Sequence, residues 1–287
     1  MTDPVHIIGA SGRSGAALSR VLLARGTAVV PVVRDPGKWA KTGLSGSPHL
    51  ADLRDPAALR AALTGAVRIA SCAHARHAAA VIAAAPPDAR LIFLGSTRKF
   101  TRWQDAHGNG VLAGEAAFLD SGRSGVMLHP TMIYGAEGEN NVRRLADVLR
   151  RLPFVPLPNG GGALVQPIHQ DDVTAAALAA LAHSWSGPNS FVIAGPSPLT
   201  YADFVRAIAS AAGLQPPRIV AFPAAPLIAA AWIARLLPFL PDVGPAEIRR
   251  LLEDKAFDIA PARAALGFAP ITLQEGLART FSTPHHR

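Results

Sequence analysis

A glycine loop directly after an apolar run constrains the fold of this chain more than any other feature. Residues 5–9 predict a buried strand, and residues 14–25 have the pattern of a helix. Between them Gly9, Gly12 and Gly15 follow the spacing G-x-x-G-x-x-G. We expect Gly9 to form a tight turn, Gly12 to let a pyrophosphate approach the backbone, and Gly15 to let the helix pack closely. The helix would point its unpaired N–H groups at the phosphates.

The loop also contains Ser11, Arg13 and Ser14, which we predict to contact the same dinucleotide. The cofactor should be selected at the end of the second strand, where NAD sites place an acidic residue for the ribose 2′-hydroxyl. This chain has Arg34 there, followed by Asp35. Arg34, with help from Arg13, can bind a 2′-phosphate, so we predict NADP(H) in preference to NAD(H). The alternative is that Arg34 is solvated and Asp35 binds the ribose.

Short apolar runs alternate with helical stretches through the first two-thirds of the chain. This alternation predicts the α/β class, with a doubly wound parallel sheet of the Rossmann type. Ligands of such sheets bind at the carboxyl ends of the strands. At the ends of the third and fourth predicted strands we therefore place further cofactor contacts: Asp52, Leu53, Ala70, Ser71 and Cys72. Asp52 is expected to place its carboxylate at the adenine amino group.

Beyond about residue 140 the alternation loosens into shorter pieces. We predict a dinucleotide-binding domain over residues 1–153, with residues 164–185 returning to it. Residues 186–287 are expected to form a smaller C-terminal α/β lobe that covers a substrate site. The apolar stretch 223–241 contains Arg235 and four prolines, which argues against a transmembrane span. We expect it to pack as a helix in the small lobe, with peripheral membrane contact as the weaker alternative.

Charge and cysteine content limit the classes of partner. The formal net charge of +8 suits an anionic partner, but the basic residues are spread along the chain without a basic–aromatic motif. We therefore expect an anionic cofactor or a basic surface rather than nucleic acid. Cys72 is the single cysteine, so no disulfide forms within the chain. With no recognisable signal peptide, the sequence predicts a cytoplasmic protein.

These motifs resemble the short-chain dehydrogenase/reductase superfamily, specifically its extended and atypical branches with the NAD-dependent epimerases and dehydratases. The resemblance spans nearly the whole chain. Besides the glycine loop it rests on these segments: 52–53, 95–97, 129–135, 166–173, 194–200 and 266–268. It implies that Gly95, Pro130 and Ile133 also contact the cofactor. It also implies a helix at residues 110–122 that pairs between subunits, so a homodimer is a hypothesis.

The chain departs from the family at the acid–base pair. The superfamily uses a Tyr and a Lys spaced Y-x-x-x-K on one helix, where the ammonium lowers the pKa of the phenol. The matching positions here are Val111 and Glu115. Neither of the two tyrosines, Tyr134 and Tyr201, has a lysine four residues later. The usual proton-transfer pair is therefore absent from the sequence.

Four residues are candidates to replace that pair. Thr97, at the family's hydroxyl position, and the adjacent Ser96 could polarise a carbonyl, or else be satisfied by the backbone at a strand end. Tyr134 lies in the loop that passes the nicotinamide in relatives. Lys99 could be a displaced proton donor, or a solvated loop lysine.

Two other polar groups are expected to be structural. We expect Glu115 to form a cap or to pair locally. The stretch containing His169, Asp171 and Asp172 is expected to be a turn into a helix, with one of the two aspartates as its N-cap and with no metal.

The leading functional prediction is an NADP(H)-binding oxidoreductase-like protein that reduces a small carbonyl substrate without the usual Tyr and Lys. The alternative is a non-catalytic NADP(H)-binding sensor or assembly protein. A nucleotide-sugar epimerase is the weaker alternative, because the missing Tyr removes its mechanism.

Overall fold

A seven-stranded sheet organises the chain, as described by a computed structural model covering residues 3–135, 141–152, 154–226, 228 and 245–282. Its strands are β1 (Val5–Ile8), β2 (Val29–Val33), β3 (His49–Leu50), β4 (Arg68–Ser71), β5 (Arg90–Leu94), β6 (Gly125–Pro130) and β11 (Pro188–Ile193). They lie in the order β11-β6-β5-β4-β1-β2-β3, and every neighbouring pair is parallel. The predicted doubly wound α/β fold is confirmed. The strand order reverses between β1 and β4, which places a ligand crevice at their carboxyl ends.

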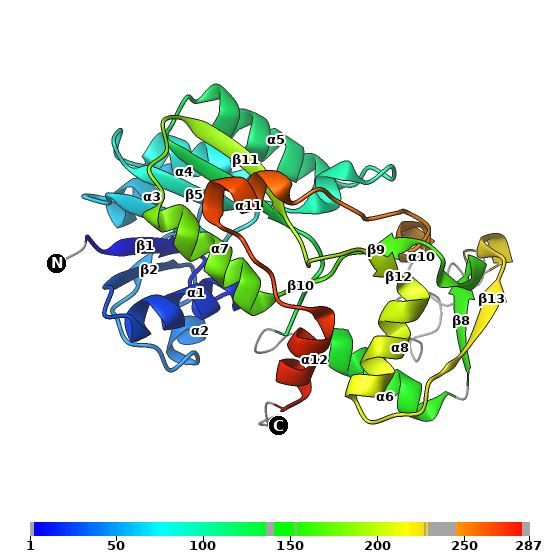
Figure 1. Cartoon of the computed structure of the whole chain (residues 1–287). Helices are drawn as coiled ribbons and strands as arrows, with labels where there is room; N and C mark the ends of the chain where they lie inside the picture. The colour runs from blue at the N-terminus through cyan, green and yellow to red at the C-terminus, as the bar shows by residue number, and fades with distance from the viewer. Residues whose placement is uncertain (1–2, 136–140, 153, 227, 229–244, 283–287) are drawn as a thin grey trace.

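Helices cover both faces of the sheet because successive residues of each strand point to opposite sides (Figure 1). Ile7 packs with α1 (Arg13–Ala24), α7 (Gln170–Ala182) and α11 (Ala260–Leu266). The adjacent Ile8 packs on the other side with α3 (Pro56–Ala62), α4 (Ala78–Ala84) and α5 (Ala106–Asp120). Both isoleucines are fully buried, and burial of each side chain contributes roughly 1.5–3 kcal/mol.

Short helices follow three of the strands. They are α2 (Pro36–Ala40), η1 (Ala75–His77) and η2 (Thr97–Phe100). Helix α5 begins at Ala106 rather than near residue 110, because the Asp105 side chain accepts a hydrogen bond from the Gly108 N–H and caps the helix there.

A second, smaller lobe packs around Val205 and Ile208 of helix α8 (Tyr201–Ala211), at the right of Figure 1. Its other elements are α6 (Asn141–Arg151), β8 (Phe154–Pro158), η3 (Asn159–Gly161), β9 (Leu164–Val165), β12 (Leu199–Thr200), β13 (Arg218–Phe222), α10 (Pro245–Arg250) and α12 (Leu273–Ser282). Two strands, β7 (Ile133–Tyr134) and β10 (Ile168–His169), pair with each other between the sheet and this lobe. The smaller α/β lobe is therefore present.

The predicted domain bounds differ from this packing in two ways. Helix α6 and strand β9, predicted to belong to the dinucleotide-binding domain, pack in the smaller lobe. Strand β11 and helix α11, predicted to belong to the lobe that starts at residue 186, lie with the main sheet. Strand β11 pairs with β6 along its whole length and is an edge strand of the main sheet. Helix α11, near the C-terminus, packs against β11 as well. Both elements are short and have no pattern that distinguishes a sheet strand from a lobe strand, so the sequence did not reveal where they lie.

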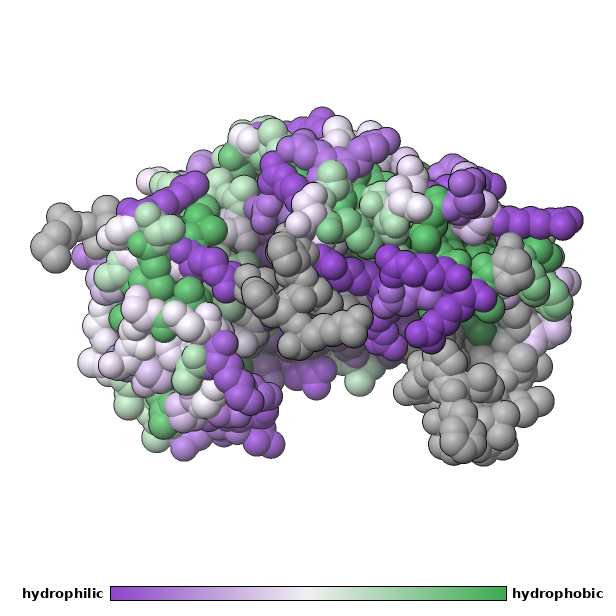
Figure 2. Space-filling view, turned by 90° about the horizontal axis from the view of Figure 1, so that it is seen from below, coloured by the Kyte–Doolittle hydropathy of each residue, from purple (hydrophilic) through white to green (hydrophobic). Residues whose placement is uncertain are grey.

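The surface is mixed in character on the face shown in Figure 2, where hydrophilic side chains are interspersed with small apolar groups. Most of the apolar stretch 223–241 lies outside the described residues. Among the helices that are described, none has both the length and the apolar character needed to cross a membrane.

Candidate functional site

The glycine loop forms the turn from β1 into α1. Gly9 has a φ of +75°, and its N–H donates to the Val32 carbonyl at 2.9 Å. A Cβ on Gly15 would lie 2.2 Å from the Gly9 carbonyl oxygen, so this position needs glycine. Gly12 is the N-cap of α1, and no side chain among the described residues caps this end. The first N–H groups of α1 thus have the orientation that binds phosphate.

Beside this loop lies a cavity of about 710 Å³ at the carboxyl ends of β1 and β2. Six of the predicted cofactor residues line it: Gly9, Ser11, Gly12, Arg34, Asp52 and Leu53. The structure adds residues that the sequence analysis missed, among them Lys38, Arg54 and Arg76. Lys38 and Arg54 could have been predicted from the sequence, because they come shortly after the ends of β2 and β3. The cavity therefore has four cationic side chains around it.

The two carboxylates of this cavity are already engaged. The Asp35 Oδ1 accepts hydrogen bonds from the N–H groups of Gly37, at 2.9 Å, and Lys38, at 3.3 Å, and so caps α2. Asp52 accepts from the Arg54 side chain at 2.8 and 3.1 Å. These hydrogen bonds hold the pKa of Asp52 well below its usual range. Neither carboxylate forms a direct ion pair with Arg34 among the contacts described.

The other predicted cofactor residues lie outside this cavity. Arg13 lines an adjoining hollow of about 320 Å³ between α1 and α2, which shares Ser11, Gly12 and Lys38 with the 710 Å³ cavity. The Ser14 hydroxyl donates to Gln170 Oε1 at 3.0 Å, which ties α1 to α7. In β4, Ala70 and Ser71 are buried within the sheet, and Ala73 lines the cavity in their place.

The last four predicted cofactor residues lie elsewhere along the sheet edge. They are Cys72, which follows β4, and Gly95, Pro130 and Ile133. Burial raises the pKa of the Cys72 thiol to about 12, so it is protonated at neutral pH. A Cβ on Gly95 would lie 2.3 Å from His129 Nδ1. Pro130 ends β6 and Ile133 begins β7, and neither lines the 710 Å³ cavity. Their contact with a cofactor stays a prediction.

A second cavity, of about 360 Å³, lies where β5 and β6 end and meet residues 250–257. Ser96 and Thr97 line it together with Thr131 and Met132. Both predicted hydroxyls also contact the backbone: Ser96 Oγ accepts from the Arg98 N–H at 3.2 Å, and Thr97 Oγ1 donates to the Pro130 carbonyl at 3.4 Å. The hydroxyls of Ser96 and Thr97 thus border the cavity, and each already makes one hydrogen bond to the backbone.

Lys99 is neither a solvated lysine nor a residue of this cavity. Its Nζ lies 2.5 and 2.6 Å from the two carboxylate oxygens of Glu115, and the Lys99 side chain is only 10% exposed. His129 Nδ1 accepts from the Ser96 N–H, so its Nε2 carries the proton and donates to Glu115 Oε1 at 3.1 Å. The Ser190 hydroxyl donates to the same oxygen.

Glu115 is therefore the shared acceptor of a buried polar cluster, consisting of Lys99, Glu115, His129 and Ser190. Burial by itself would raise the pKa of Glu115, but hydrogen bonds from His129, Lys99 and Ser190 outweigh it and hold the pKa at about 2. Val111, at the position expected for Tyr, is buried in the core. The expectation that Glu115 caps or pairs locally is wrong, since its partners come from three other elements.

The structure contradicts the placement of Tyr134 beside the reacting centre. Its ring is 2% exposed and packs edge-on against His169, with 5.2 Å between ring centroids. A Cβ on Gly276 of α12 would lie 2.1 Å from the Tyr134 hydroxyl oxygen. Burial raises the pKa of this phenol above its ordinary value. Tyr134 is thus a packing residue between β10 and α12, and it lines neither cavity.

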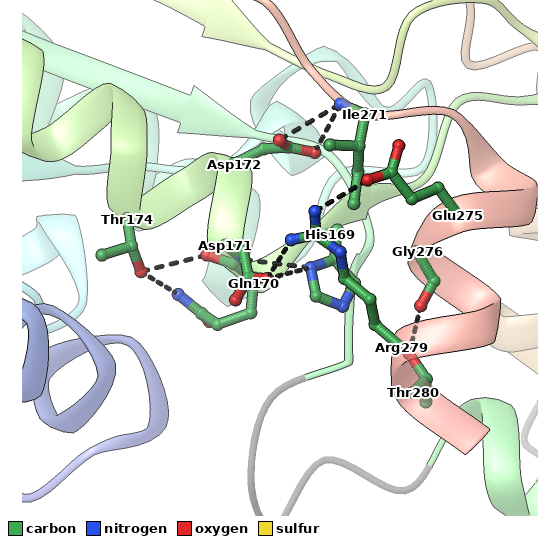
Figure 3. A network of polar contacts seen from close by, with 10 residues as sticks. All are labelled: His169, Gln170, Asp171, Asp172, Thr174, Ile271, Glu275, Gly276, Arg279 and Thr280. Atoms are coloured by element: carbon green, nitrogen blue, oxygen red, sulfur yellow. Dashed lines mark hydrogen bonds and ion pairs between the residues drawn. The ribbon is translucent and has the colours of Figure 1, made fainter. Parts of the chain in front are cut away.

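A polar network joins the start of α7 to α12 (Figure 3). His169, not an aspartate, is the N-cap of α7, because its Nδ1 accepts from the Asp171 N–H at 3.2 Å. Asp171 pairs with Arg279 at 2.8 Å, and Asp172 accepts from the Ile271 N–H at 3.2 Å. The N-cap prediction for Asp171 or Asp172 is therefore wrong, and both carboxylates hold the small lobe against α7.

Comparison with known sequences gives a distant relationship. No family model matches the chain. The uncharacterized protein Rv2047c of Mycobacterium tuberculosis is 29% identical over 212 residues, which are 73% of this chain and 23% of that protein. The chain thus matches about a quarter of the length of this curated relative.

Solved structures match over nearly the full chain. MoeE5 in complex with UDP-glucose and NAD has a TM-score of 0.74 at 19% identity, covering 98% of each chain. The NADPH-dependent quinone oxidoreductase QOR2 of Escherichia coli, in complex with NADPH, has a TM-score of 0.74 at 20% identity, covering 96% of this chain and 99% of QOR2. Structural neighbours are proteins of the short-chain dehydrogenase/reductase and epimerase type. At these identities the likeness establishes the Rossmann fold.

Proposed function

We propose that this protein is an NADP(H)-binding oxidoreductase of the short-chain dehydrogenase/reductase type that reduces a small carbonyl compound without a Tyr–Lys pair. The observation that supports it most is the charge around the 710 Å³ cavity: four cationic side chains line it, and both of its carboxylates are engaged in a cap or an ion pair. An acidic residue free to bind a ribose 2′-hydroxyl is the usual mark of NAD sites. The NADPH bound by QOR2 and the NAD bound by MoeE5 support a nicotinamide cofactor in this fold.

The residues present fit such a cofactor. Gly12 and the N-terminus of α1 would hold the pyrophosphate, and Arg34 with Lys38 would hold the 2′-phosphate through charge-assisted hydrogen bonds. When bound, the cofactor supplies a hydride to a carbonyl carbon. Ser96 and Thr97 would orient that carbonyl from the edge of the 360 Å³ cavity.

Arg34→Ala is expected to weaken NADPH binding by 10-fold to 100-fold and to leave NADH binding unchanged. Hydrogen bonds to charged groups contribute about 1.5–3 kcal/mol, and the 2′-phosphate is the only group that distinguishes the two cofactors. Calorimetric titration of the wild type and the variant with NADPH and with NADH measures this directly. Arg60→Ala is the matched control, because Arg60 is an exposed arginine on α3 that does not line the cavity.

Two results would contradict the proposal. Equal loss of NADPH and NADH binding in Arg34→Ala would mean that Arg34 does not bind the 2′-phosphate. Failure of the wild type to bind either dinucleotide would show that the glycine loop is only a structural turn.

A non-catalytic NADP(H)-binding sensor or assembly protein is the second candidate. The specific observation in its favour is the closed cluster around Glu115, which takes the place of the expected lysine and engages Lys99. NADPH oxidation with a panel of aldehydes, ketones and quinones separates the two. Tight NADPH binding without turnover of any of them would favour this candidate.

A homodimer through α5 also stays part of the proposal, as does a cytoplasmic location. Leu112 and Leu119 lie on this helix and are 44% and 42% exposed, which leaves apolar area for a second copy. Light scattering after gel filtration is expected to give twice the mass of the chain, and a monomer would remove this part of the proposal.

A further inference from the structure

The 360 Å³ cavity is bordered by the sheet on one side and by the C-terminal lobe on the other. The sheet contributes Ser96 and Thr97, which follow β5, and Thr131, which follows β6. The lobe contributes residues after α10, including Lys255 and Phe257. A group on this C-terminal segment is therefore placed to act on a molecule oriented by the hydroxyls at the sheet edge.

Lys255 is held firmly in that wall. Its backbone N–H donates to the Leu164 carbonyl at 2.8 Å, and its Nζ donates to the Arg250 carbonyl at 2.7 Å. The neighbouring Asp254 accepts from the Leu164 N–H at 2.8 Å, which ties the same segment to β9 a second time. The Nζ is thus oriented by one backbone acceptor and retains further N–H bonds that a ligand can use.

Chemistry separates Lys255 from the other charged groups of the cavity. Arg98, Arg102 and Arg250 carry guanidinium groups, a type of side chain that does not act as a proton donor in proteins. Glu253 accepts from the Thr101 hydroxyl at 2.9 Å and from the Arg102 N–H at 2.7 Å, so its carboxylate oxygens are already used as acceptors. Among the described lining residues, Lys255 is the one that carries an amine, a group that can release a proton and take it up again.

The charges around Lys255 favour release of that proton. Burial lowers the pKa of its ammonium; Glu253 opposes this, while Arg250 and Arg98 lower the pKa further. Asp105 lies beyond these arginines and pairs with both of them, at 2.5 Å to Arg98 and 3.6 Å to Arg250. A lysine tuned in this direction is a stronger acid than one in water.

Two aromatic rings give the cavity a shape preference. Phe100 and Phe257 both line it, with centroids 5.5 Å apart and an interplanar angle of 38°. Phe100 is 53% exposed although it is a large apolar side chain, and Met132 beside it is 39% exposed. A planar ring that covers these side chains would bury apolar area and gain offset stacking.

We propose that Lys255 is the proton donor of the reaction, acting on a planar, ring-bearing carbonyl compound that lies against Phe100 and Phe257. This inference rests on the proposed function. In the step an N–H bond of the ammonium breaks and an O–H bond forms on the carbonyl oxygen, whose C=O π electrons become the new bonding pair. The carbon receives a hydride from the reduced dinucleotide. The N–H electron pair stays on the Lys255 amine, which then takes up one H⁺ from the solvent, so that overall the carbonyl compound, the reduced dinucleotide and one H⁺ give the alcohol and the oxidised dinucleotide.

The first test needs no turnover. Pulse labelling of the full chain with acetic anhydride between pH 6 and 11, followed by peptide mass spectrometry, compares Lys255 with the exposed Lys41 in one sample. Lys255 is expected to become reactive at lower pH than Lys41. The probe 2-naphthalenemethanol should slow labelling of Lys255 at least 10-fold, whereas cyclohexylmethanol, which cannot stack, should slow it less. Equal titration of the two lysines, or no protection by the naphthyl compound, would overturn the proposal.

The second test uses NADPH-driven reduction of 2-naphthaldehyde by the wild type, Lys255→Met and Lys255→Arg. Loss of a general acid costs about 10²-fold to 10⁴-fold in rate, so both variants should lose at least 100-fold in kcat and keep wild-type NADPH affinity. The kcat of the wild type should fall as pH rises, because the donor must be protonated.

The failures of the two proposals can be told apart. If NADPH binds and Lys255→Arg keeps its activity, only the assignment of Lys255 is wrong. If the wild type binds NADPH but reduces no carbonyl compound, the assignment falls together with the oxidoreductase function. If NADPH does not bind, the proposed cofactor itself is wrong.

Discussion

Glu115→Ala is expected to lower the free energy of unfolding by about 3–5 kcal/mol, the range found when one partner of a buried ion pair is removed. Glu115 is the shared acceptor for Lys99, His129 and Ser190. Without it the Lys99 side chain, which is 10% exposed, keeps no carboxylate among the contacts described, and the fully buried His129 keeps only the Ser190 hydroxyl, at 3.1 Å, as an acceptor for its Nε2 proton. Urea unfolding followed by circular dichroism measures the change.

The double variant Glu115→Leu with Lys99→Met shows whether the buried charge is the cause. Replacing both partners by apolar groups of similar size removes the uncompensated charge, so the double variant should be more stable than Glu115→Ala. If the double variant is as unstable as Glu115→Ala, packing rather than charge would explain the loss.

The same cluster predicts how stability depends on pH. The pKa of Glu115 is about 2 in the folded protein, below its ordinary value of 4.5. A lowered pKa contributes stability that is complete above pH 4.5 and is lost as the pH falls towards 2. The contribution is about 3 kcal/mol at 1.36 kcal/mol per pKa unit. Asp171, with a pKa also held at about 2, acts in the same range, so the difference between wild type and Glu115→Gln isolates Glu115.

The fold was predictable because its signals are local. Three signals predicted it: the period of the apolar runs, the glycine spacing of the loop and the alternation of strands with helices. Each can be read from short windows of sequence, and the structure confirmed the fold that they predicted. The place of β11 was not predictable, since it depends on a pairing with β6 across some 60 residues. The start of α5 was misplaced because the capping role of Asp105 was overlooked.

The site was predictable only where it follows directly from strand ends. Arg34 and Asp52 line the cavity as expected, since the carboxyl ends of parallel strands share one edge. Lys99 and Glu115 are 16 residues apart on different elements, and nothing in either segment reveals their contact. Lys255 lies even farther along the chain from Thr97, so its place in the same cavity depends on how the C-terminal segment folds back.

Gly15→Ala is expected to destabilise the fold by about 3 kcal/mol, at the upper end for an added methyl group in a packed site. The new Cβ would lie 2.2 Å from the Gly9 carbonyl oxygen and 2.9 Å from the Ala10 Cα. Both contacts are with backbone, so relief requires α1 to move away from β1. That movement shifts the N–H groups that would hold the pyrophosphate, and NADPH binding should fall at least 10-fold in calorimetric titration.

Two further glycines separate the loss of the fold from the loss of the site. A Cβ on Gly12 would lie 3.2 Å from the Gly9 carbonyl oxygen, and the φ of −80° suits alanine. Gly12→Ala should therefore lower the unfolding free energy much less than Gly15→Ala, while its methyl group obstructs the pyrophosphate and weakens NADPH binding. Gly162→Ala, with nothing within 4 Å of the new Cβ, should change neither quantity. Because Gly12 faces the cavity without supporting the core, wild-type NADPH affinity in Gly12→Ala would show that the loop does not bind the phosphates.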